Sequence, residues 1–419
     1  MESFIINGQK SLNGQIKVCT AKNALLPILA GCLMCDGIVT LHDVTYYEDI
    51  NNMLNILQSL GIKIKKEENQ LVLDCTNVSK YIIPLELASK LRASVFCLGP
   101  ILSRLKKARL AYPGGCSIGL RKIDIHLTCL QELGAKIIDK HGYITAYAEN
   151  MKAGQVHMSF PSVGATENLI MASIFLKGKT TLLGVAKEPE ICDLCNFLNA
   201  LGANIKGAGT DTIEIVGVNK LGGGEYKPIP DRIIAGTYLM LPLIAGGEIE
   251  INNINPQHIT ALTYLLKNNS CKIHIKSDKI IVAKKGRLKN FKKVETLPYP
   301  HFATDLQQPL TTLACLCKGT TIITENMFES RFKHVPELIK MGAKINICES
   351  SIVIDGVSEL YGAEVETFDL RGGASLVLAG LGANGYTTIK NVGIIDRGYY
   401  KLEDALKGLG ADIKRIKTD

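Results

Sequence analysis

The residues best suited to chemistry lie in a glycine-rich segment, residues 112–121, which reads YPGGCSIGLR. Glycine loses backbone entropy on ordering and proline lacks an amide donor, so this composition disfavours both helix and strand. We therefore expect an exposed loop that carries the thiol of Cys116 and the guanidinium of Arg121. A thiol in a loop close to a cation is suited to act as a nucleophile or a proton donor. A surface turn with an incidental cysteine is the alternative, and the rest of the chain must decide between them.

Several polar residues stand where an apolar segment begins. Lys22 and Asn23 open one such segment, and Ser162 opens another that continues through small residues. The start of a helix attracts anions, because its first backbone N–H groups have no partner within the helix. Asp305 stands just ahead of a third apolar segment, a position that suits either a helix cap or a general base.

Three arginines, Arg331, Arg371 and Arg397, each follow a strand-like segment, and Asp369 precedes the second of them. Scattered arginines are usually solvated. Arginines at corresponding places of successive segments, however, are typical of one site that binds a carboxylate or a phosphate.

Other motifs have a better structural explanation. The pairs Cys32/Cys35 and Cys192/Cys195 have zinc-like spacing but no second pair of Cys or His nearby, so we interpret them as packing thiols. The glycines of residues 380–385 match a dinucleotide fingerprint, but they follow a helical pattern and precede a strand, the reverse of the required order. We expect neither a metal nor a cofactor.

A short phrase recurs along the chain at intervals of about 70 residues, which is the mark of a repeat architecture. It reads LGIKI from Leu60, LGAKI from Leu133, LGANI from Leu201, MGAKI from Met341 and LGADI from Leu409, with a degraded copy, NSCKI, from Asn269. Each copy ends an amphipathic helical pattern, with glycine as the C-cap, and leads into a strand. The chain therefore contains six α/β units.

A second, more apolar kind of helix is predicted within residues 24–33, 169–176, 233–244, 311–317 and 375–381. Helices that are apolar on all sides are buried, so each unit should have an inner helix, an outer helix and a small sheet. Six units divide naturally into two domains of three, and the proline-bounded residues 222–230 are interpreted as the linker. The strands expected near residues 4–6 and 15–18 could pair with either domain.

The composition excludes several classes of protein. The net charge is +8, but Lys and Arg are spread along the chain and Trp is absent, so we expect no nucleic-acid partner and, at most, a cleft for small anions. The apolar run at residues 233–247 is about 15 residues long and contains a proline, which is too short to span a membrane. No signal peptide is recognised, and the 13 cysteines indicate free thiols in a cytoplasmic protein.

These motifs together resemble the enolpyruvyl transferase family, and within it the branch that uses UDP-N-acetylglucosamine in peptidoglycan synthesis. The resemblance runs from end to end through AKNALLPIL, PGGCSIG, PSVGAT, ENMFESRF, DLRGGASLVLAG and IDRGY. It implies an inside-out α/β barrel of two domains, residues 22–229 and residues 1–21 with 230–419. It also implies transfer of the enolpyruvyl group of phosphoenolpyruvate to the 3′-hydroxyl of UDP-N-acetylglucosamine, with release of phosphate and without a metal. We expect a monomer.

The resemblance also assigns roles. Lys22, Arg121 and Arg397 match the contacts to phosphoenolpyruvate, a compact anion that suits converging cations. Cys116 matches the loop cysteine that forms a phosphoenolpyruvate adduct, and Asp305 matches the proposed base. The contacts to the UDP-sugar and the residues that line the cleft correspond to Asn23, Arg92, Arg121, Lys122, Ile123, Asp124, Ile125, Ser162, Val163, Gly164, Asp305, Met327, Arg331, Asp369 and Arg371.

Some positions depart from the family pattern. Phe160 and Glu48 stand where some relatives have lysine, and Lys122 where they have proline. Two alternatives remain: the shikimate-pathway enolpyruvyl transferase, which has no such cysteine loop, and a non-catalytic protein that binds a UDP-sugar. Retention of Lys22, Cys116, Asp305 and Arg397 together argues against an inactive site.

Overall fold

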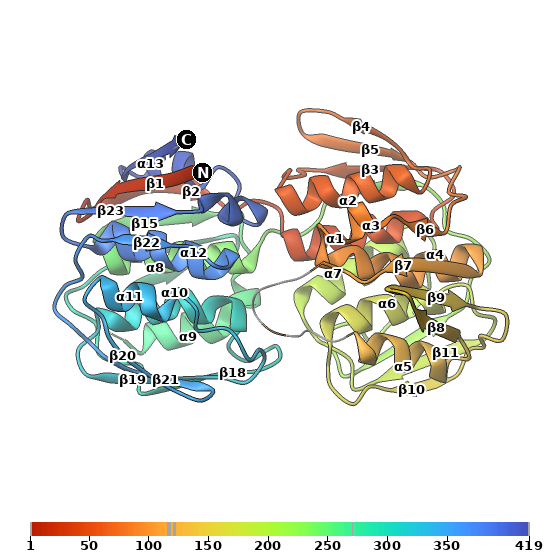
Figure 1. The fold of residues 1–419 in the computed structure, drawn as a ribbon. Coiled ribbons are helices and arrows are strands. Elements are labelled where there is room, and N and C mark those ends of the chain that lie inside the picture. The colour runs from red at the N-terminus through yellow and green to blue at the C-terminus, as the bar shows by residue number, and fades with distance from the viewer. Residues whose placement is uncertain (1, 115–118, 120–122, 270, 418–419) are drawn as a thin grey trace. The chain divides into compact units, whose positions relative to one another are not determined.

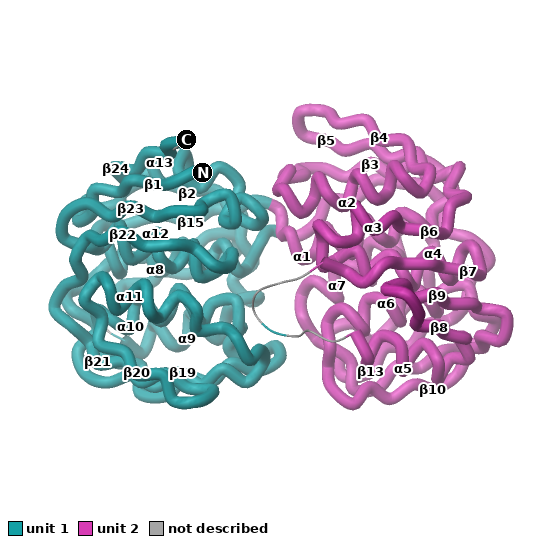
Figure 2. The backbone as a smooth tube through the Cα atoms, viewed as in Figure 1, with its two compact units in different colours: residues 1–19, 117–120, 230–419 teal, residues 20–116, 121–229 magenta. Residues whose placement is uncertain are grey.

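The chain forms two compact units in a computed structural model, which describes residues 2–114, 119, 123–269 and 271–417. Unit 1 contains residues 1–19, 117–120 and 230–419, and unit 2 contains residues 20–116 and 121–229 (Figure 2). The chain therefore passes between the units near residues 20 and 230.

Each unit contains three four-stranded sheets within the described residues, all with the same pattern of pairing. In the sheet β14-β3-β5-β4, the edge strand β14 (Gly224–Tyr226) runs parallel to β3 (Ile38–His42). β3 then pairs antiparallel with β5 (Gln70–Asp74), which pairs antiparallel with β4 (Lys63–Lys66). Along β5 the residues alternate between buried and half-buried, so one face of the sheet covers the helices.

In unit 2 the sheets β6-β7-β9-β8 and β10-β11-β13-β12 repeat this pattern (Figure 1). Besides the strands already named, unit 2 contains α1 (Lys22–Gly31), η1 (Cys32–Met34), α2 (Glu48–Ser59), β6 (Ile82–Ile83), α3 (Leu85–Ala88), η2 (Arg92–Cys97), α4 (Leu98–Leu105), β7 (Lys107–Ala111), α5 (Asp124–Glu132), β8 (Lys136–Lys140), β9 (Tyr143–Tyr147), β10 (Gln155–His157), α6 (Val163–Ser173), β11 (Lys179–Leu183), α7 (Pro189–Ala200), β12 (Ile205–Lys206) and β13 (Thr212–Val216).

In unit 1 the sheets are β16-β17-β15-β2, β18-β19-β21-β20 and β22-β23-β1-β24. Its elements are β1 (Glu2–Asn7), β2 (Leu12–Lys17), α8 (Arg232–Ala245), β15 (Gly247–Asn252), η3 (Pro256–Ile259), α9 (Thr260–Lys267), β16 (Lys272–Ile275), β17 (Lys279–Ala283), β18 (Lys293–Thr296), η4 (Thr304–Leu306), α10 (Gln307–Cys315), β19 (Thr320–Glu325), α11 (Val335–Lys340), β20 (Lys344–Cys348), β21 (Ser351–Asp355), β22 (Glu364–Glu366), α12 (Leu370–Gly382), β23 (Tyr386–Lys390), η5 (Val392–Arg397), α13 (Leu402–Gly408) and β24 (Asp412–Lys417).

The inner helices are α1, α4 and α6 in unit 2 and α8, α10 and α12 in unit 1. As predicted, they are buried on nearly all sides; in α8 every residue from Ile233 to Ile244 is buried. In unit 1 their last turns meet, because a Cβ atom on Gly382 would lie 2.6 Å from Ile244 and 3.5 Å from Leu316. Their first turns meet as well, through contacts described below. The three inner helices of unit 1 therefore run parallel.

The six recurring phrases lie where the outer helices end. The glycines Gly61, Gly134, Gly202, Gly342 and Gly410 all have φ between +92° and +112°, the left-handed conformation expected of a C-cap. Each follows an outer helix (α2, α5, α7, α11 or α13) and precedes a strand. The repeat predicted from sequence is therefore confirmed in the described residues.

Two details of the sequence interpretation were wrong. Residues 222–230 are not only a linker, because β14 within them completes the first sheet of unit 2 beside β3. The prediction also omitted an inner helix, α4, whose start contains Gly99 and Pro100. Gly99 lets this helix approach α6 closely, since a Cβ atom there would lie 2.4 Å from the carbonyl oxygen of Asn168.

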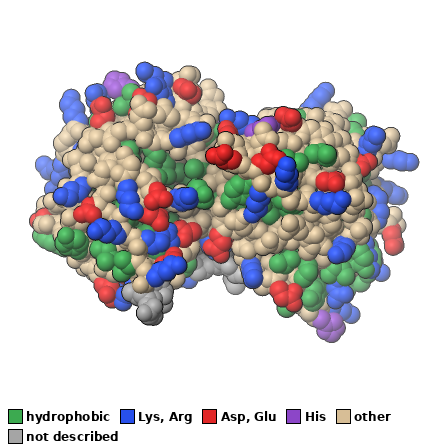
Figure 3. All heavy atoms as spheres, turned by 90° about the horizontal axis from the view of Figure 1, so that it is seen from above, with side chains coloured by type: hydrophobic (Ala, Val, Ile, Leu, Met, Phe, Trp, Pro, Cys, Tyr) green, Lys and Arg blue, Asp and Glu red, His purple; other side chains and the backbone are tan. Residues whose placement is uncertain are grey.

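Charged side chains of both signs are intermixed on the surface, as expected from the sequence. On the face drawn in Figure 3, Lys and Arg side chains alternate with Asp and Glu and form no continuous basic stripe. Among the described residues, no helix is both long and apolar enough to cross a membrane.

The C-cap glycines provide a test of the repeat. We expect Gly410→Ala to lower the free energy of unfolding by about 1–2 kcal/mol, because an L-residue is strained in the left-handed conformation. Gly408→Ala is the matched control: Gly408 ends α13, has no positive φ and has no atom within 4 Å of an added Cβ. Urea unfolding of both variants gives the comparison, and equal stability of the two would contradict the assignment.

Candidate functional site: helix starts rich in charged residues

In unit 1, the carboxylate of Asp305 is held by two arginines. Nη2 of Arg331 donates to Oδ1, while Nη2 and Nε of Arg371 donate to Oδ2 over 3.1 and 3.3 Å. The two guanidinium side chains are only 2% and 4% exposed, whereas that of Asp305 is 24% exposed. The part of this cluster that solvent and ligands reach is therefore the carboxylate.

The start of α12 fixes Arg371. Asp369 caps this helix and accepts hydrogen bonds from the backbone N–H groups of Arg371 and Gly372, over 3.0 and 2.9 Å. The guanidinium of Arg371 lies over the ring of Tyr399, 5.3 Å from its centroid. Burial opposes the charge of Arg371, but Asp305, Tyr399 and Asp231 outweigh it and raise the pKa of the guanidinium. Arg371 is therefore a fixed positive charge.

Hydrogen bonds join the starts of all three inner helices of unit 1. At the start of α10, Nε2 of Gln308 donates to both carboxylate oxygens of Asp369, over 3.1 and 3.2 Å. From α8, Thr237 shares a hydrogen bond of 2.9 Å with the hydroxyl of Tyr399. Because helix N-termini carry partial positive charge, their convergence offsets part of the negative charge of Asp305 and Asp369 at this end of unit 1.

Two further predicted residues of unit 1 are positioned from outside the inner helices. The backbone N–H of Met327 donates to Glu325, whose other carboxylate oxygen accepts from Thr304, the neighbour of Asp305. Arg397 ends η5 and is half-buried. The preceding residue, Asp396, accepts two hydrogen bonds from Arg415, which ties η5 to β24.

In unit 2, Lys22 begins α1 and is buried. Its ammonium group forms a salt bridge of 2.9 Å with Asp49, a buried residue of the first turn of α2. Tyr47, just ahead of α2, donates its hydroxyl to the carbonyl of Thr20 over 2.9 Å, which holds the two helix starts together. Asn23 follows Lys22 and is half-exposed. The salt bridge therefore fixes a cation at a helix N-terminus.

The other inner helices of unit 2 also begin at predicted residues. Arg92 begins η2, which leads into α4, and Ser162 caps α6, followed by Val163 and Gly164. The side chain of Asn168 links α6 to α4 by accepting from the N–H of Gly99 over 2.7 Å. As in unit 1, the charged and polar residues predicted from sequence lie where the inner helices start.

Some predicted residues lie in or beside the loop. Ile123 precedes α5 and is buried, while Asp124 and Ile125 form its first turn. Cys116, Arg121 and Lys122 lie outside the described residues, so their roles remain predictions. Figure 1 draws that part of the chain as a thin grey trace.

Sequence reasoning missed the partners that hold these side chains. Asp49, Gln308 and Tyr399 were not singled out, although each contacts or supports a predicted residue. Asp49 has an ordinary explanation in the sequence, since acidic residues are common in the first turn of a helix. Only the fold brings it to Lys22.

The remaining cysteines behave as predicted. Cys32, Cys35 and Cys195 are buried free thiols, and Cys192 is half-buried. Burial raises the pKa of the Cys97 and Cys315 thiols to about 12, so these groups are poor nucleophiles. No group of His, Cys, Asp and Glu suited to a metal ion occurs among the residues that the structure describes.

In both units, charged side chains are held in fixed positions at the starts of inner helices. A sequence profile described as EPSP synthase (3-phosphoshikimate 1-carboxyvinyltransferase) matches residues 6–406. The chain therefore belongs to the enolpyruvyl transferase family, and it is a transferase with the two-domain fold of that family.

Two relatives within this family bear the name of the same enzyme. The chain is 45% identical over 418 residues to "UDP-N-acetylglucosamine 1-carboxyvinyltransferase 2" of Carboxydothermus hydrogenoformans, covering 99% of this chain and 100% of that protein. It is 42% identical over 417 residues to "UDP-N-acetylglucosamine 1-carboxyvinyltransferase" of Geobacter metallireducens, covering 100% of both.

Solved structures agree on the fold. The enolpyruvyl transferase NikO from Streptomyces tendae matches with a TM-score of 0.90 at 22% identity, covering 100% of this chain and 99% of that one. EPSP synthase from Acinetobacter baumannii matches with a TM-score of 0.77 at 18% identity, covering 100% of both chains. At such identities the likeness concerns the fold alone.

His334, at the start of α11, offers a test of this buried network. It is 2% exposed, and neither ring nitrogen has a hydrogen-bond partner in the described residues. Burial lowers the pKa of His334 to about 4, helped by Arg331 and opposed by Asp369. As the pH falls from about 6.5, the unfolded chain therefore binds a proton that the folded protein does not. The contribution of His334 to the free energy of unfolding should fall between about pH 6.5 and pH 4, by roughly 1 kcal/mol per pH unit.

We expect His334→Phe to flatten this pH dependence, because phenylalanine keeps a ring but does not titrate. The measurement is urea unfolding between pH 7 and pH 4.5. The control is His274→Phe on the exposed side of β16, which should keep the slope of the unchanged protein. An unaltered slope in His334→Phe would contradict a neutral, buried His334.

Proposed function

We propose that this chain transfers the enolpyruvyl group of phosphoenolpyruvate to the 3′-hydroxyl of UDP-N-acetylglucosamine and releases phosphate. The observation that carries the proposal is its identity of 42–45%, over essentially the full length, to relatives that bear this enzyme's name. The charged starts of the inner helices support it, because both substrates are anions. This reaction is a step of peptidoglycan synthesis.

The proposed donor site rests on fixed cations. Phosphoenolpyruvate carries a phosphate and a carboxylate, and Lys22, Arg121 and Arg397 are the proposed contacts. Lys22 is suited to this role because Asp49 holds its ammonium group at the start of α1, where free backbone N–H groups add positive charge. Asp49 is a positioning residue in this proposal.

The chemistry consists of an addition and an elimination. In the addition, the sugar 3′-oxygen bonds to C2 of phosphoenolpyruvate, a base takes the hydroxyl proton, and C3 gains a proton. In the elimination, C3 loses a proton and the bond between C2 and the phosphate oxygen breaks. The base and C3 both give up the protons that they gain, and no oxidant or reductant is required.

Asp305 is the proposed base for the sugar hydroxyl. Two buried guanidinium groups hold its carboxylate and favour the ionised form, which is the form that accepts a proton. The same ion pairs weaken the carboxylate as a base. Bound substrate must therefore supply part of the driving force, through a proton transfer that is coupled to formation of the C–O bond. Cys116 is proposed as the acid that protonates C3 or as a residue that controls product release.

A first test concerns the acceptor. We expect phosphate release from phosphoenolpyruvate to require UDP-N-acetylglucosamine and to continue in the presence of EDTA. Shikimate 3-phosphate is the necessary second acceptor, because the family profile that matches the chain is named for the enzyme that uses it. Release with shikimate 3-phosphate, or with neither acceptor, would refute the proposal.

A second test concerns the base. Asp305→Asn keeps the shape of the side chain but cannot accept the proton, so we expect turnover to fall by about 10²–10⁴-fold. Affinity for UDP-N-acetylglucosamine should change far less. Asp404→Asn, an exposed residue of α13, is the control and should keep full activity.

Single-turnover kinetics and the melting temperature separate the explanations for Asp305. Intact chemistry with a weakened affinity for the sugar would make Asp305 an anchor, and the base would then be another group. Loss of folding would show as a lowered melting temperature, since removal of the anion leaves Arg331 and Arg371 buried with less compensation. A folded variant with slow chemistry is the expected outcome.

A further inference from the structure

Unit 2 contains a pocket at the ends of its inner helices, opposite the starts where Lys22, Arg92 and Ser162 lie. It has a cavity volume of about 580 Å³, within the range typical of small-molecule sites. Its lining includes Met34 after α1, Ser103 in the last turn of α4, and Phe175 just after α6. The pocket therefore lies where the three inner helices of unit 2 end, whereas Lys22, Arg92 and Ser162 lie where they start.

The lining of this pocket is strongly basic. It contains Arg104, Lys106, Lys177 and Lys220 but a single carboxylate, that of Asp36. Lys106, Lys177 and Lys220 are exposed, and no carboxylate within 4.0 Å of their ammonium groups occurs among the described residues. The ammonium group of Lys106 donates to the carbonyl of Ser103 over 2.9 Å, so Lys177 and Lys220 are the cations available to a ligand.

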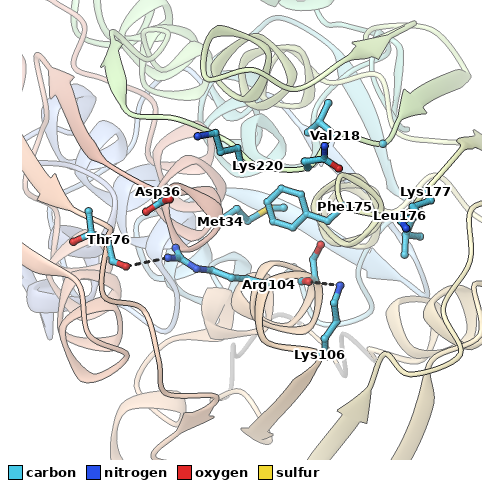
Figure 4. A pocket seen from close by; sticks show the side chains of 13 residues that line it. Met34, Asp36, Thr76, Arg104, Lys106, Phe175, Leu176, Lys177, Val218 and Lys220 are labelled. Atoms are coloured by element: carbon cyan, nitrogen blue, oxygen red, sulfur yellow. Dashed lines mark hydrogen bonds between the residues drawn. The ribbon is translucent and has the colours of Figure 1, made fainter.

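Arg104 satisfies four carbonyl groups at this end of unit 2. Its guanidinium donates to the carbonyls of Leu33, Cys35, Cys75 and Thr76, over 2.6 to 3.3 Å. In Figure 4 it extends from its helix toward Thr76, and Phe175 lies beside Met34. In unit 1 Arg287 does the same for Leu316, Cys317, Gly356 and Val357. Cations at helix ends thus have a structural role that Arg104 already fulfils.

One residue of the pocket lining has a buried hydroxyl without a hydrogen-bond partner in the described residues. Ser103 is 3% exposed, and its hydroxyl has no partner within the described residues. A buried hydroxyl without a partner is costly, so native structures usually satisfy it with a water or a ligand. In unit 1, by contrast, the helix ends are filled by apolar contacts between Gly382, Ile244 and Leu316.

From these observations we propose that this pocket binds a phosphorylated small molecule. The lysines are suited to the phosphate, because an ammonium group binds it as a compact point charge. The hydroxyl of Ser103 would donate to a phosphate oxygen, and the half-buried ring of Phe175 offers an apolar surface to the remainder of the ligand. The site is separate from the proposed catalytic residues and does not depend on the proposed function.

Isothermal titration of the full chain with inorganic pyrophosphate tests the site. We expect pyrophosphate to bind at two sites. Phosphoenolpyruvate should compete for only one of them, so the other binding event should persist without competition. In the double variant Lys177→Ala/Lys220→Ala the event without competition should weaken at least about tenfold, because each charge-assisted hydrogen bond contributes more than 1 kcal/mol. The matched control, Lys152→Ala/Lys206→Ala, removes two exposed lysines of unit 2 outside the pocket and should keep both events.

Ser103→Ala provides an independent measurement. Since the hydroxyl has no partner in the protein, its removal should leave the melting temperature unchanged while weakening the same pyrophosphate event. Identical isotherms for the unchanged protein and the lysine double variant would overturn the proposal. A single event that phosphoenolpyruvate displaces completely would overturn it too, whatever the outcome of the activity assays.

Discussion

The parallel packing of three buried helices is the constraint on which each unit depends. Every helix leaves N–H groups unpaired at its start and carbonyl groups unpaired at its end, and parallel packing gathers groups of one kind in one place. At the starts, Asp231, Asp369 and Ser162 cap helices through their side chains. At the ends, Arg104 and Arg287 each bind four carbonyls. The six sheets cover helices that have been arranged in this way.

The parallel packing of the helices also explains why the polar side chains of the site have fixed positions. A cation such as Lys22 or Arg371 would repel the positive ends of the helices around it, so each is balanced by a carboxylate, Asp49 or Asp305. The resulting clusters contain side chains whose positions are fixed by ion pairs. Such prepared geometry is what electrostatic catalysis requires, because little reorganisation remains for the moment of reaction.

Much of the fold could be predicted because each repeat contains the same short-range sequence features. Gly61 and its counterparts recur since only glycine adopts the left-handed C-cap without strain, and the inner helices are apolar enough to stand out. The helix α4 was missed for an equally local reason. Gly99 and Pro100 resemble a helix break, although proline in a first turn loses no hydrogen bond. The roles of the site residues remain predictions, and their partners could not be predicted from the sequence, because the pair Arg371 and Asp305 joins residues 66 positions apart.

The first strand of the chain has a consequence for synthesis on the ribosome. β1 lies between β23 and β24, and Asn7 contacts Asp412 across 405 positions of sequence. Unit 2 has all of its strands once residue 229 has emerged, whereas β1 has neither of its partner strands until residues 386–417, which contain β23 and β24, are made. The nascent chain must therefore carry an unpaired apolar strand through nearly the whole of translation, beside a neighbour that is already able to fold. An exposed strand of this kind is open to incorrect pairing, so the two ends of the chain are where slow synthesis or a truncation would do most harm.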